Sequence, residues 1–375
     1  MPFLHYDTII VGAGPAGCAA ALRLRQQGLR VAMIDAVKED KRKVGESLPG
    51  ASIRLLRGLG INDLFELLNK YSYEACTANR SAWGSEQWTY TDALRNPEGG
   101  GWHVVRHEFD AALRRKAIAE GVDFLCGKVG NIASGELHTL TFRTQKANLP
   151  EAIHTPWLID ATGRAAAVTR QFGVERIKFQ PQMAAVCWLH PNLQDQDRTT
   201  TIKSVANGWW YTSRLPDGSR VLSFHGLPET VASFVKDPKS YLQEANNAHL
   251  INYNLHTSHF LEDIKARDAS VSKASRVFGS NWIAVGDAAL SFDPLSSQGI
   301  FFALYSGLKA ADAHIKIKTG DTTALEQYEQ KVQNVFEANQ RSRAHFYTAE
   351  RRFINEDYWN WIPQPKLGDK IKIPF

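Results

Sequence analysis

Several features of common protein classes are missing from this chain of 375 residues. The chain has four cysteines, Cys18, Cys76, Cys126 and Cys187, and none of them forms a Cys-x-x-Cys pair. We therefore expect neither a metal site nor a disulfide framework. Cysteines that form no disulfides fit a reducing compartment, so we expect a cytoplasmic location. No apolar run approaches about 18 residues, so we expect no membrane span. No basic segment leads into an apolar run at the start, so we expect no signal peptide.

Strong charge and low complexity are also absent. The net charge of +5, from 44 basic and 39 acidic residues, is too small to indicate nucleic-acid binding, although it permits an acidic protein partner. With 43% hydrophobic and 22% charged residues and no repeats, the chain is expected to be globular, with one large or two medium domains.

A glycine-rich turn near the N-terminus predicts dinucleotide binding. An apolar strand over Asp7–Val11 runs into a helix, and a second strand, Val31–Asp35, ends in an acid. The turn between the first strand and the helix reads Gly12-Ala13-Gly14-Pro15-Ala16-Gly17. Such glycines allow a tight turn and close backbone approach to a pyrophosphate at the helix N-terminus, while the acid binds ribose hydroxyls. A glycine-rich turn without a ligand is the alternative interpretation.

A second segment, roughly 270 residues later, narrows the ligand to non-covalently bound FAD. Asp287, in Gly286-Asp287-Ala288-Ala289, follows an apolar strand and is expected to bind the ribitol chain, or else to cap a helix. Beyond it, Asp293-Pro294-Leu295-Ser296-Ser297-Gln298-Gly299-Ile300 opens a helix. Its free N–H groups would face the flavin pyrimidine and favour the anionic reduced form.

Other segments add candidate cofactor contacts. A third strand ends at the segment Asp160-Ala161-Thr162-Gly163-Arg164. This position predicts a backbone contact near the flavin or near a nicotinamide donor. The alternative is a plain strand-to-helix turn with no ligand contact. Arg106 opens a helix and is expected to contact the middle of the cofactor, unless it forms only a surface salt bridge. The remaining candidates are Gly45, Glu46, Ser47 and Val129.

The hydrophobic period changes along the chain and predicts an α/β fold. We expect a Rossmann-like FAD-binding domain, an inserted antiparallel β-sheet substrate domain and a helical C-terminal region. The FAD-binding domain is assigned to 1–79, 101–180 and 270–320, the substrate domain to 80–100 and 181–269, and the C-terminal region and tail to 321–375. The inserted strands are expected at Met183–Leu189, Thr200–Ser204, Gly208–Ser213 and Arg220–Gly226.

From roughly Tyr6 to Ala311, these segments together resemble the FAD-dependent monooxygenase and halogenase superfamily with the para-hydroxybenzoate-hydroxylase-like fold. Within the superfamily, the chain is most similar to flavoproteins that are encoded beside quinoprotein amino-acid oxidases; lysine ε-oxidase and glycine oxidase are examples of these oxidases. The similarity lies in Gly45-Glu46-Ser47-Leu48-Pro49 and in the segment from Asp293 to Ile300. Those oxidases carry cysteine tryptophylquinone. The resemblance implies a flavin-dependent monooxygenase that hydroxylates a tryptophan of a quinoprotein oxidase precursor, a post-translational modification in tryptophylquinone biogenesis.

The resemblance also implies the chemistry. FAD would be reduced by NAD(P)H, or electrons would come as reduced flavin from a separate flavin reductase, and O₂ would supply an oxygen atom to an electron-rich ring. An apolar wall beside the flavin would exclude water. Candidates for this wall, or for ordinary core packing, are Trp188, Trp209, Trp210 and Tyr211. The catalytic candidates are His225, Glu46 and Asp293. His225 is expected to act as a base, and a satisfied sheet histidine is the alternative. For Glu46 and Asp293 the alternative is a role in orienting loops.

Other functions stay open. A flavin-dependent halogenase, which the chain also resembles, needs a lysine where Asn79 falls, and no lysine occurs between Tyr71 and Lys116. Halogenases also carry a Trp-x-Trp-x-Ile-Pro string in the inserted sheet, where this chain has Tyr211-Thr212-Ser213-Arg214-Leu215-Pro216. A similar string, Trp359-Asn360-Trp361-Ile362-Pro363, is one residue shorter than the halogenase string and lies at the C-terminal end of the chain instead. A small-molecule aromatic hydroxylase, a geranylgeranyl-reductase-like enzyme and a non-catalytic flavin-bearing maturation chaperone are further alternatives.

A protein substrate would need a docking surface. The basic loop Lys38–Lys43 and the tail Arg351–Phe375 are our candidates. The tail is otherwise expected to be a strap across its own domain.

Overall fold

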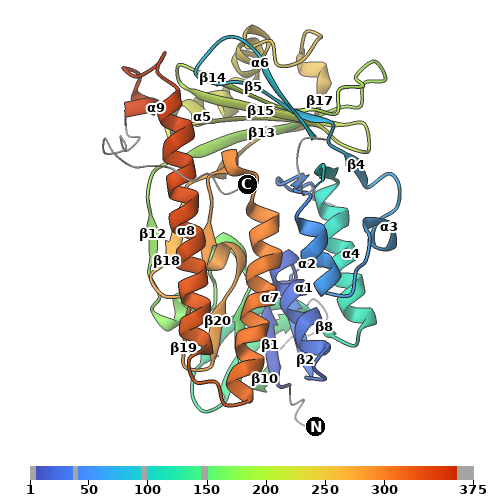
Figure 1. The fold of residues 1–375 in the computed structure, drawn as a ribbon, viewed down its shortest axis with the longest axis vertical. Coiled ribbons are helices and arrows are strands. Elements are labelled where there is room, and N and C mark those ends of the chain that lie inside the picture. The colour runs from blue at the N-terminus through green and yellow to red at the C-terminus, as the bar shows by residue number, and fades with distance from the viewer. Residues whose placement is uncertain (1–5, 37–40, 94–98, 145–150, 361–375) are drawn as a thin grey trace.

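The computed structural model describes residues 6–36, 41–93, 99–144 and 151–360. A seven-stranded sheet lies across the top of the molecule in Figure 1, and an eight-stranded sheet occupies its lower half. The long helices α7 (Gly299–Lys318) and α8 (Ala324–Ala349) run beside the lower sheet. The predicted α/β fold, with a Rossmann-like unit, an inserted sheet and a helical C-terminal region, is confirmed.

The eight-stranded sheet brings three strand ends to one edge. Its order is β10-β9-β8-β2-β1-β11-β20-β19, and the five strands from β8 to β20 are parallel. The carboxyl ends of β1, β11 and β20 therefore meet where ligands bind in open α/β sheets. The strands are β1 Thr8–Val11, β2 Val31–Asp35, β8 Asp123–Ala133, β9 His138–Thr144, β10 Glu151–Thr155, β11 Leu158–Asp160, β19 Phe278–Gly279 and β20 Trp282–Ala284.

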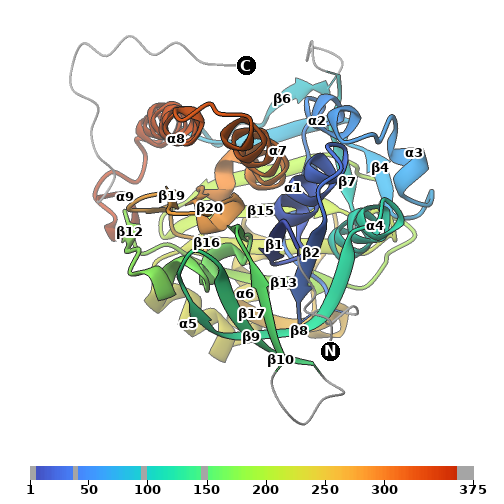
Figure 2. The ribbon, with the colours of Figure 1, turned by 90° about the horizontal axis from the view of Figure 1, so that it is seen from below.

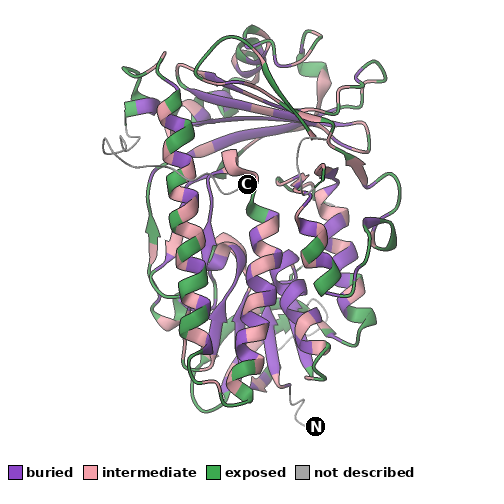
Figure 3. Ribbon diagram, in the orientation of Figure 1, coloured by how far each residue is buried: buried purple, intermediate pink, exposed green. Residues whose placement is uncertain are grey.

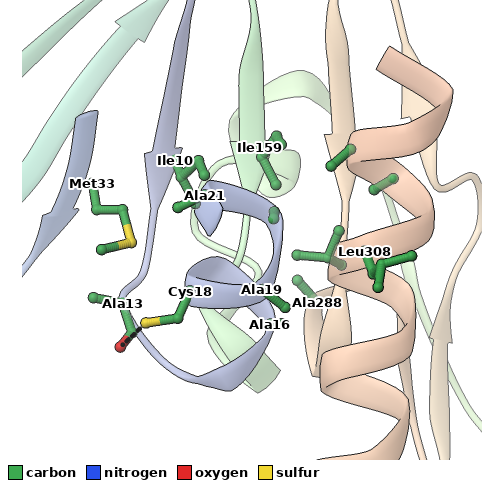
Figure 4. Packing of buried hydrophobic residues seen from close by; sticks show 14 of the residues in the cluster. Ile10, Ala13, Ala16, Cys18, Ala19, Ala21, Met33, Ile159, Ala288 and Leu308 are labelled. Carbon is green, nitrogen blue, oxygen red and sulfur yellow. Dashed lines mark hydrogen bonds between the residues drawn. The ribbon is translucent and has the colours of Figure 1, made fainter. Parts of the chain in front are cut away.

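Helix α1 (Pro15–Arg25) packs on this sheet through small side chains. Figure 4 shows Ala16 and Ala19 of α1 close to Ala288 and Leu308. The approach of α7 is closer still, because a Cβ atom on Gly307 would lie 2.2 Å from the carbonyl oxygen of Ala16. Figure 2 shows α1, α7 and α8 side by side. Small residues thus let α1 and α7 pack together.

The seven-stranded sheet has the order β17-β13-β16-β15-β14-β5-β6, antiparallel except for the β14–β5 pair. One face is covered by α5 (Pro228–Lys236) and α6 (Pro238–Asn247), where Trp210 packs. Trp209 and Tyr211 face the other way, because successive side chains of a strand alternate. The strands are β5 Ala78–Ala82, β6 Thr89–Asp92, β13 Met183–Leu189, β14 Thr200–Val205, β15 Gly208–Arg214, β16 Arg220–Gly226 and β17 Phe260–Asp268.

Two three-stranded sheets and several short helices complete the described fold. The first small sheet holds β12 Arg176–Lys178, β18 Ser272–Ala274 and β21 Leu290–Ser291, and the second holds β3 Ser47–Leu48, β7 Trp102–Val104 and β4 Tyr73–Ala75. The other helices are α2 Ser52–Gly58, α3 Leu64–Leu67, α4 Arg106–Ala119 and α9 Asp357–Asn360, and the 3₁₀ turns are η2 Gly163–Ala165, η3 Thr169–Phe172, η4 Thr257–His259, η5 Gly286–Ala288 and η6 Pro294–Ser296. None of the helices in the described ranges is long and apolar enough to cross a bilayer.

The inserted unit contains elements that the alternating pattern did not predict, namely α5, α6 and β17. Local signals for both helices are present. Pro228 and Pro238 occupy the first helical positions, and the Asp237 side chain caps α6 by accepting from the backbone N–H groups of Lys239 and Ser240. In the first unit, the apolar residues at helical spacing over Ile53–Leu68 fall in two short helices, α2 and α3.

The described part of the C-terminal tail packs on its own chain. Tyr358 and Trp359 are buried, and Trp359 Nε1 donates to the Val205 carbonyl at 3.0 Å. Figure 3 shows α8 with exposed and buried residues alternating along its length. Tyr358 and Trp359 therefore strap the tail to its own chain, the docking role of the tail stays a prediction, and residues 361–375 lie outside the described part.

The basic loop Lys38–Lys43 also forms ion pairs with other parts of the chain, at the residues of the loop that the structure describes. Arg42 pairs with Asp217 of the inserted sheet at 2.7 Å, and Lys43 pairs with Asp110 of α4 at 2.9 Å. These two cations join the loop to both halves of the molecule, which argues against the docking role that we considered for them. Lys38 lies outside the described residues.

Candidate functional site

A cavity of about 340 Å³ separates the carboxyl edge of the eight-stranded sheet from the inner face of the seven-stranded sheet. Most predicted site residues line it: Gly14, Pro15, Ala16, Gly45, Glu46, Ser47, Arg106, Ala161, Gly163, His225, Gly286, Asp287, Asp293, Pro294, Gln298, Gly299 and Ile300. Six predicted residues do not: Gly12, Ala13, Gly17, Asp35, Val129 and Asp160. Residues that are distant in sequence thus converge on one site.

The first glycine turn combines tight packing with open space. Gly12 has φ of +107°, and a Cβ atom there would lie 2.2 Å from the Ala161 carbonyl oxygen. A Cβ atom on Gly17 would lie 2.0 Å from the Gly12 carbonyl oxygen, whereas one on Gly14 would meet nothing within 4 Å. Gly12 and Gly17 therefore shape the turn, and Gly14 leaves room for an anion at the N-terminus of α1.

Asp35 and Val129 lie outside the cavity, on neighbouring strands. Asp35 ends β2, and its Oδ2 atom accepts a 2.7 Å hydrogen bond from the Ala13 backbone N–H. The acid predicted to bind ribose thus also ties down the glycine turn. Val129 is on β8, beyond the position where Cys126 pairs with Asp35.

Asp160 holds its loop rather than facing the cavity. Its two carboxylate oxygens accept from the backbone N–H and the hydroxyl of both Thr162 and Thr169, at 2.6 to 3.0 Å. These four bonds position Ala161 and Gly163, which do line the cavity.

The second motif places another helix N-terminus at the cavity. Gly299 starts the 20-residue helix α7, and a Cβ atom on it would meet nothing within 4 Å. Gly286 has φ of +56°, and its N–H donates to Ser306 Oγ at 2.8 Å. Asp287 follows it, with a 38% exposed side chain and the Arg164 guanidinium 3.5 Å away.

These features fit FAD. The N-termini of α1 and α7 face one cavity, and each carries a glycine with empty space where a side chain would be. The first would hold the pyrophosphate and the second the flavin pyrimidine, because helix N-termini favour negative charge. Asp287 lines the cavity, whereas Asp35 lies outside it, and the binding of cofactor hydroxyl groups by these two acids stays a prediction.

Glu46 and Arg106 line the same cavity as these two helix ends. Arg106 Nε donates to Asp110 Oδ1 at 2.7 Å and its Nη1 to the Val44 carbonyl at 3.1 Å, so the ion pair we considered does form, within the cavity wall. Glu46 is 4% exposed, and Oε1 has no hydrogen-bond partner among the described residues. Burial raises the pKa of Glu46, although the N–H groups of Glu46 and Gly45, Arg106 and Tyr211 oppose the rise.

Asp293 is fully engaged. Its Oδ1 atom accepts from the Leu295 N–H at 3.0 Å, and Oδ2 accepts from Arg343 Nε at 2.9 Å and from the Tyr347 hydroxyl at 2.8 Å. The pair with Arg343 is buried, with 7% and 2% of the side chains exposed. This arrangement favours the loop-orienting role over the catalytic role that we also considered for Asp293.

His225 lies in the upper wall with one ring nitrogen engaged. Its Nε2 atom is 3.0 Å from Ser223 Oγ, and Nδ1 has no hydrogen-bond partner among the described residues. Burial lowers the pKa of His225 to about 3, which keeps the ring neutral. Its role as a base stays a prediction.

Two of the four predicted wall aromatics reach the cavity. Trp209 and Tyr211 line it, together with Ala184, Val186 and Val221. Trp210 packs against α5 and α6, and Trp188 packs in the sheet without lining the cavity. The alternation of β15 explains why Trp210 is excluded.

Sequence reasoning missed the side chains that support this wall. Trp209 Nε1 donates to the hydroxyl groups of Tyr347 at 3.1 Å and Tyr358 at 3.0 Å. Arg343 and Tyr347, one helical turn apart on α8, also bind Asp293. Their spacing on one helix face is a signal of burial, but it does not identify the partners.

The cavity holds no lysine among its described lining residues. Asn79, the residue aligned with the halogenase lysine, lies on β5 and is exposed outside the cavity. The described residues also contain no cluster of side chains suited to a metal ion.

Comparison with known proteins adds a family and several relatives. The profile of the FAD binding domain family matches residues 5–342. The FAD-dependent oxidoreductase LodB of Marinomonas mediterranea is 24% identical over 94% of this chain and 96% of its own length. A 1H-pyrrole-2-carbonyl-[peptidyl-carrier protein] brominase of Pseudoalteromonas luteoviolacea is 24% identical over 83% of this chain and 77% of its own length. Among solved structures, the peptidyl tryptophan dihydroxylase QhpG, essential for tryptophylquinone cofactor biogenesis, superposes with a TM-score of 0.78 at 22% identity over 97% of this chain and 80% of its own.

Proposed function

The chain belongs to the FAD binding domain family, and from this premise we propose that it hydroxylates a tryptophan side chain of a partner precursor protein during tryptophylquinone biogenesis. It is a flavin-dependent oxidoreductase with FAD as its cofactor, and the resemblance seen in its motifs is confirmed. We further propose that NAD(P)H, or reduced flavin from a separate reductase, supplies electrons and that O₂ supplies the oxygen atom.

The observation that carries the proposal is the wall opposite the flavin-binding segments. It carries Trp209, Tyr211 and small aliphatic side chains beside the polar Ser223 and His225, and no lysine lines the described cavity. An oxygen-transferring flavin needs a dry wall beside an aromatic ring, whereas the halogenase resemblance requires a lysine. The fold shared with the peptidyl tryptophan dihydroxylase supports a tryptophan of a quinoprotein precursor as the substrate.

The chain would supply position and electrostatics for this reaction. When bound and reduced, FAD supplies the reaction with O₂ and the transfer of one oxygen atom to the ring. The N-terminus of α7 would stabilise negative charge on the cofactor, and Asp287 would hold a hydroxyl group. Trp209 and Tyr211 would exclude water, and Glu46, whose pKa is raised by burial, would hold a proton beside Arg106.

Mass spectrometry tests the proposal directly. The protein is incubated with FAD, a reductant, O₂ and bromide, together with a candidate quinoprotein precursor, free tryptophan and small phenols. We expect one or two oxygen atoms on one precursor tryptophan, and none when that tryptophan is replaced by phenylalanine or when the reductant is omitted.

Other outcomes select other functions. Oxygen on small molecules alone would indicate an aromatic hydroxylase. Halogenation is the second candidate, because a brominase is among the relatives, and bromine on any substrate would establish it. An unmodified precursor that nevertheless binds the flavin-loaded protein would indicate a maturation chaperone.

We also propose that the protein acts in the cytoplasm. All four cysteines are free in the structure, as a reducing compartment would keep them. Fractionation of the producing cells, with the protein found outside the cytoplasmic fraction, would reject this location.

A further inference from the structure

His225 is a buried polar side chain that the fold leaves half satisfied at the cavity. It lies on β16, is 5% exposed, and lines the cavity across from the flavin-binding segments. Its Nδ1 atom has no hydrogen-bond partner among the described residues. Buried polar atoms are usually paired, so the unpaired Nδ1 atom of a residue that lines a ligand cavity is a candidate for a partner supplied by the ligand.

The imidazole ring of His225 is fixed in orientation. It stacks on the Trp209 indole with ring centroids 3.8 Å apart and planes 6° from parallel. Trp209 is itself held by the Tyr347 and Tyr358 hydroxyl groups, and Ser223 Oγ engages His225 Nε2 at 3.0 Å. A ring held by stacking and by one nitrogen presents its other nitrogen in a defined position, as a recognition group requires.

We propose that His225 Nδ1 is a substrate-binding acceptor that takes a hydrogen bond from the N–H group of an aromatic ring. This inference rests on the proposed function, in which that ring is the indole of a precursor tryptophan. In the tautomer that this proposal assigns, Nε2–H donates to Ser223 Oγ and Nδ1 keeps its lone pair. An indole N–H can only donate, and it needs such an acceptor once it leaves water. The site therefore selects rings with a polar N–H edge over purely hydrocarbon rings.

The chain offers a matched control in His103. This histidine lies on β7, is fully buried, and has its Nε2 atom 2.9 Å from the Thr200 hydroxyl, much as His225 lies beside Ser223. It does not line the cavity. A His103→Phe variant therefore reproduces the loss of a buried histidine without touching the proposed binding group.

The test measures how the FAD-loaded protein discriminates two small probes. Indole and benzothiophene have nearly the same shape, but only indole has an N–H group. Binding of each is followed by its perturbation of the flavin absorbance. We expect indole to bind about 10-fold more tightly in the unmodified protein, the ratio to fall to about 1 in His225→Phe, and the ratio to stay at about 10 in His103→Phe.

The contrary results are equally defined. An equal affinity for both probes in the unmodified protein, or an unchanged preference in His225→Phe, would overturn the inference. If His225→Phe fails to retain FAD, Ser223→Ala is measured instead: it leaves the ring in place but frees its tautomer, so the preference should fall, and an unchanged preference would again overturn the inference.

The same probes separate this inference from the proposed function. A precursor that gains no oxygen, together with a His225-dependent preference for indole, would reject the proposed function alone. A hydroxylated precursor with no such preference would reject only the role of His225.

Discussion

The two walls of the cavity are built in different ways. The lower wall, which faces the cofactor, has stretches of open backbone among its side chains: the turns at Gly14 and Gly163 and the first residue of α7, Gly299, all leave empty space where a Cβ atom would be. The upper wall, on the seven-stranded sheet, is made of side chains such as Trp209 and His225, which are held by stacking and hydrogen bonds.

This difference separates cofactor binding from substrate selection. A backbone wall recognises groups common to every FAD molecule and tolerates no added side chain. A side-chain wall can change its chemistry by single substitutions while the fold is kept. The fold shared with both a brominase and a tryptophan dihydroxylase is consistent with that division.

The largest expected effect is on the backbone wall, at two glycines only two residues apart. Gly12→Ala places a Cβ atom 2.2 Å from the Ala161 carbonyl oxygen at a φ of +107°, so we expect loss of folded protein. Gly14→Ala meets no protein atom within 4 Å, so we expect a folded protein whose FAD affinity falls about 10-fold or more, because the methyl group enters cofactor space.

Circular dichroism and the ratio of flavin to protein absorbance in the purified variants check this pair. A Gly12→Ala variant that folds and binds FAD normally would contradict the packing argument. A Gly14→Ala variant with unchanged FAD affinity would show that the cofactor does not approach this turn.

The same difference explains what the sequence could predict. The glycine turns at Gly12 and Gly299 follow from short-range patterns, since strand, turn and helix are consecutive in the chain. The stack of Trp209 on His225 depends on the register of β15 and β16, and the bonds of Trp209 to Tyr347 join residues 138 positions apart. No local pattern specifies such pairs, so Tyr347 and Ser223 were missed, and four aromatic residues were considered for a wall that two of them reach.

Asp293 is the side chain that joins the two walls, and its loss should have the next largest effect. It is in the flavin-side loop but binds Arg343 and Tyr347 of α8, and Tyr347 also supports Trp209. Asp293→Asn removes the negative charge of this buried ion pair, so the buried Arg343 guanidinium loses its carboxylate partner at this position. We therefore expect the free energy of unfolding to fall by about 3 kcal/mol.

Asp217→Asn is the matched control for Asp293→Asn. Asp217 also caps a turn, at Ser219, and pairs with an arginine, Arg42, but its side chain is 30% exposed. We expect its substitution to cost no more than about 1 kcal/mol. Urea unfolding of both variants gives the comparison, and equal losses would mean that burial of the Asp293 pair adds nothing.

The smallest expected effect concerns Glu46, the one carboxyl group in the backbone wall that is buried with an oxygen lacking a partner among the described residues. Burial raises its pKa above the usual 4.5, so the folded protein holds this proton to higher pH than the unfolded chain does. At a pH between the pKa of Glu46 in the unfolded chain and its raised pKa in the folded protein, the folded state binds more protons than the unfolded state. The free energy of unfolding therefore falls as the pH rises through this range. A glutamine at this position does not titrate and escapes that fall.

Glu46→Gln should therefore melt higher than the unmodified protein at pH 8, by roughly 2 °C, and the difference should shrink as the pH is lowered through this window towards pH 4. Thermal melts of the FAD-loaded proteins across this range measure it. The exposed Glu244 of α6, changed to Gln, is the control and should show no comparable pH-dependent difference. A Glu46→Gln variant that is less stable at pH 8 than at pH 4, relative to the unmodified protein, would mean that the ionised carboxylate of Glu46 is stabilised in the cavity.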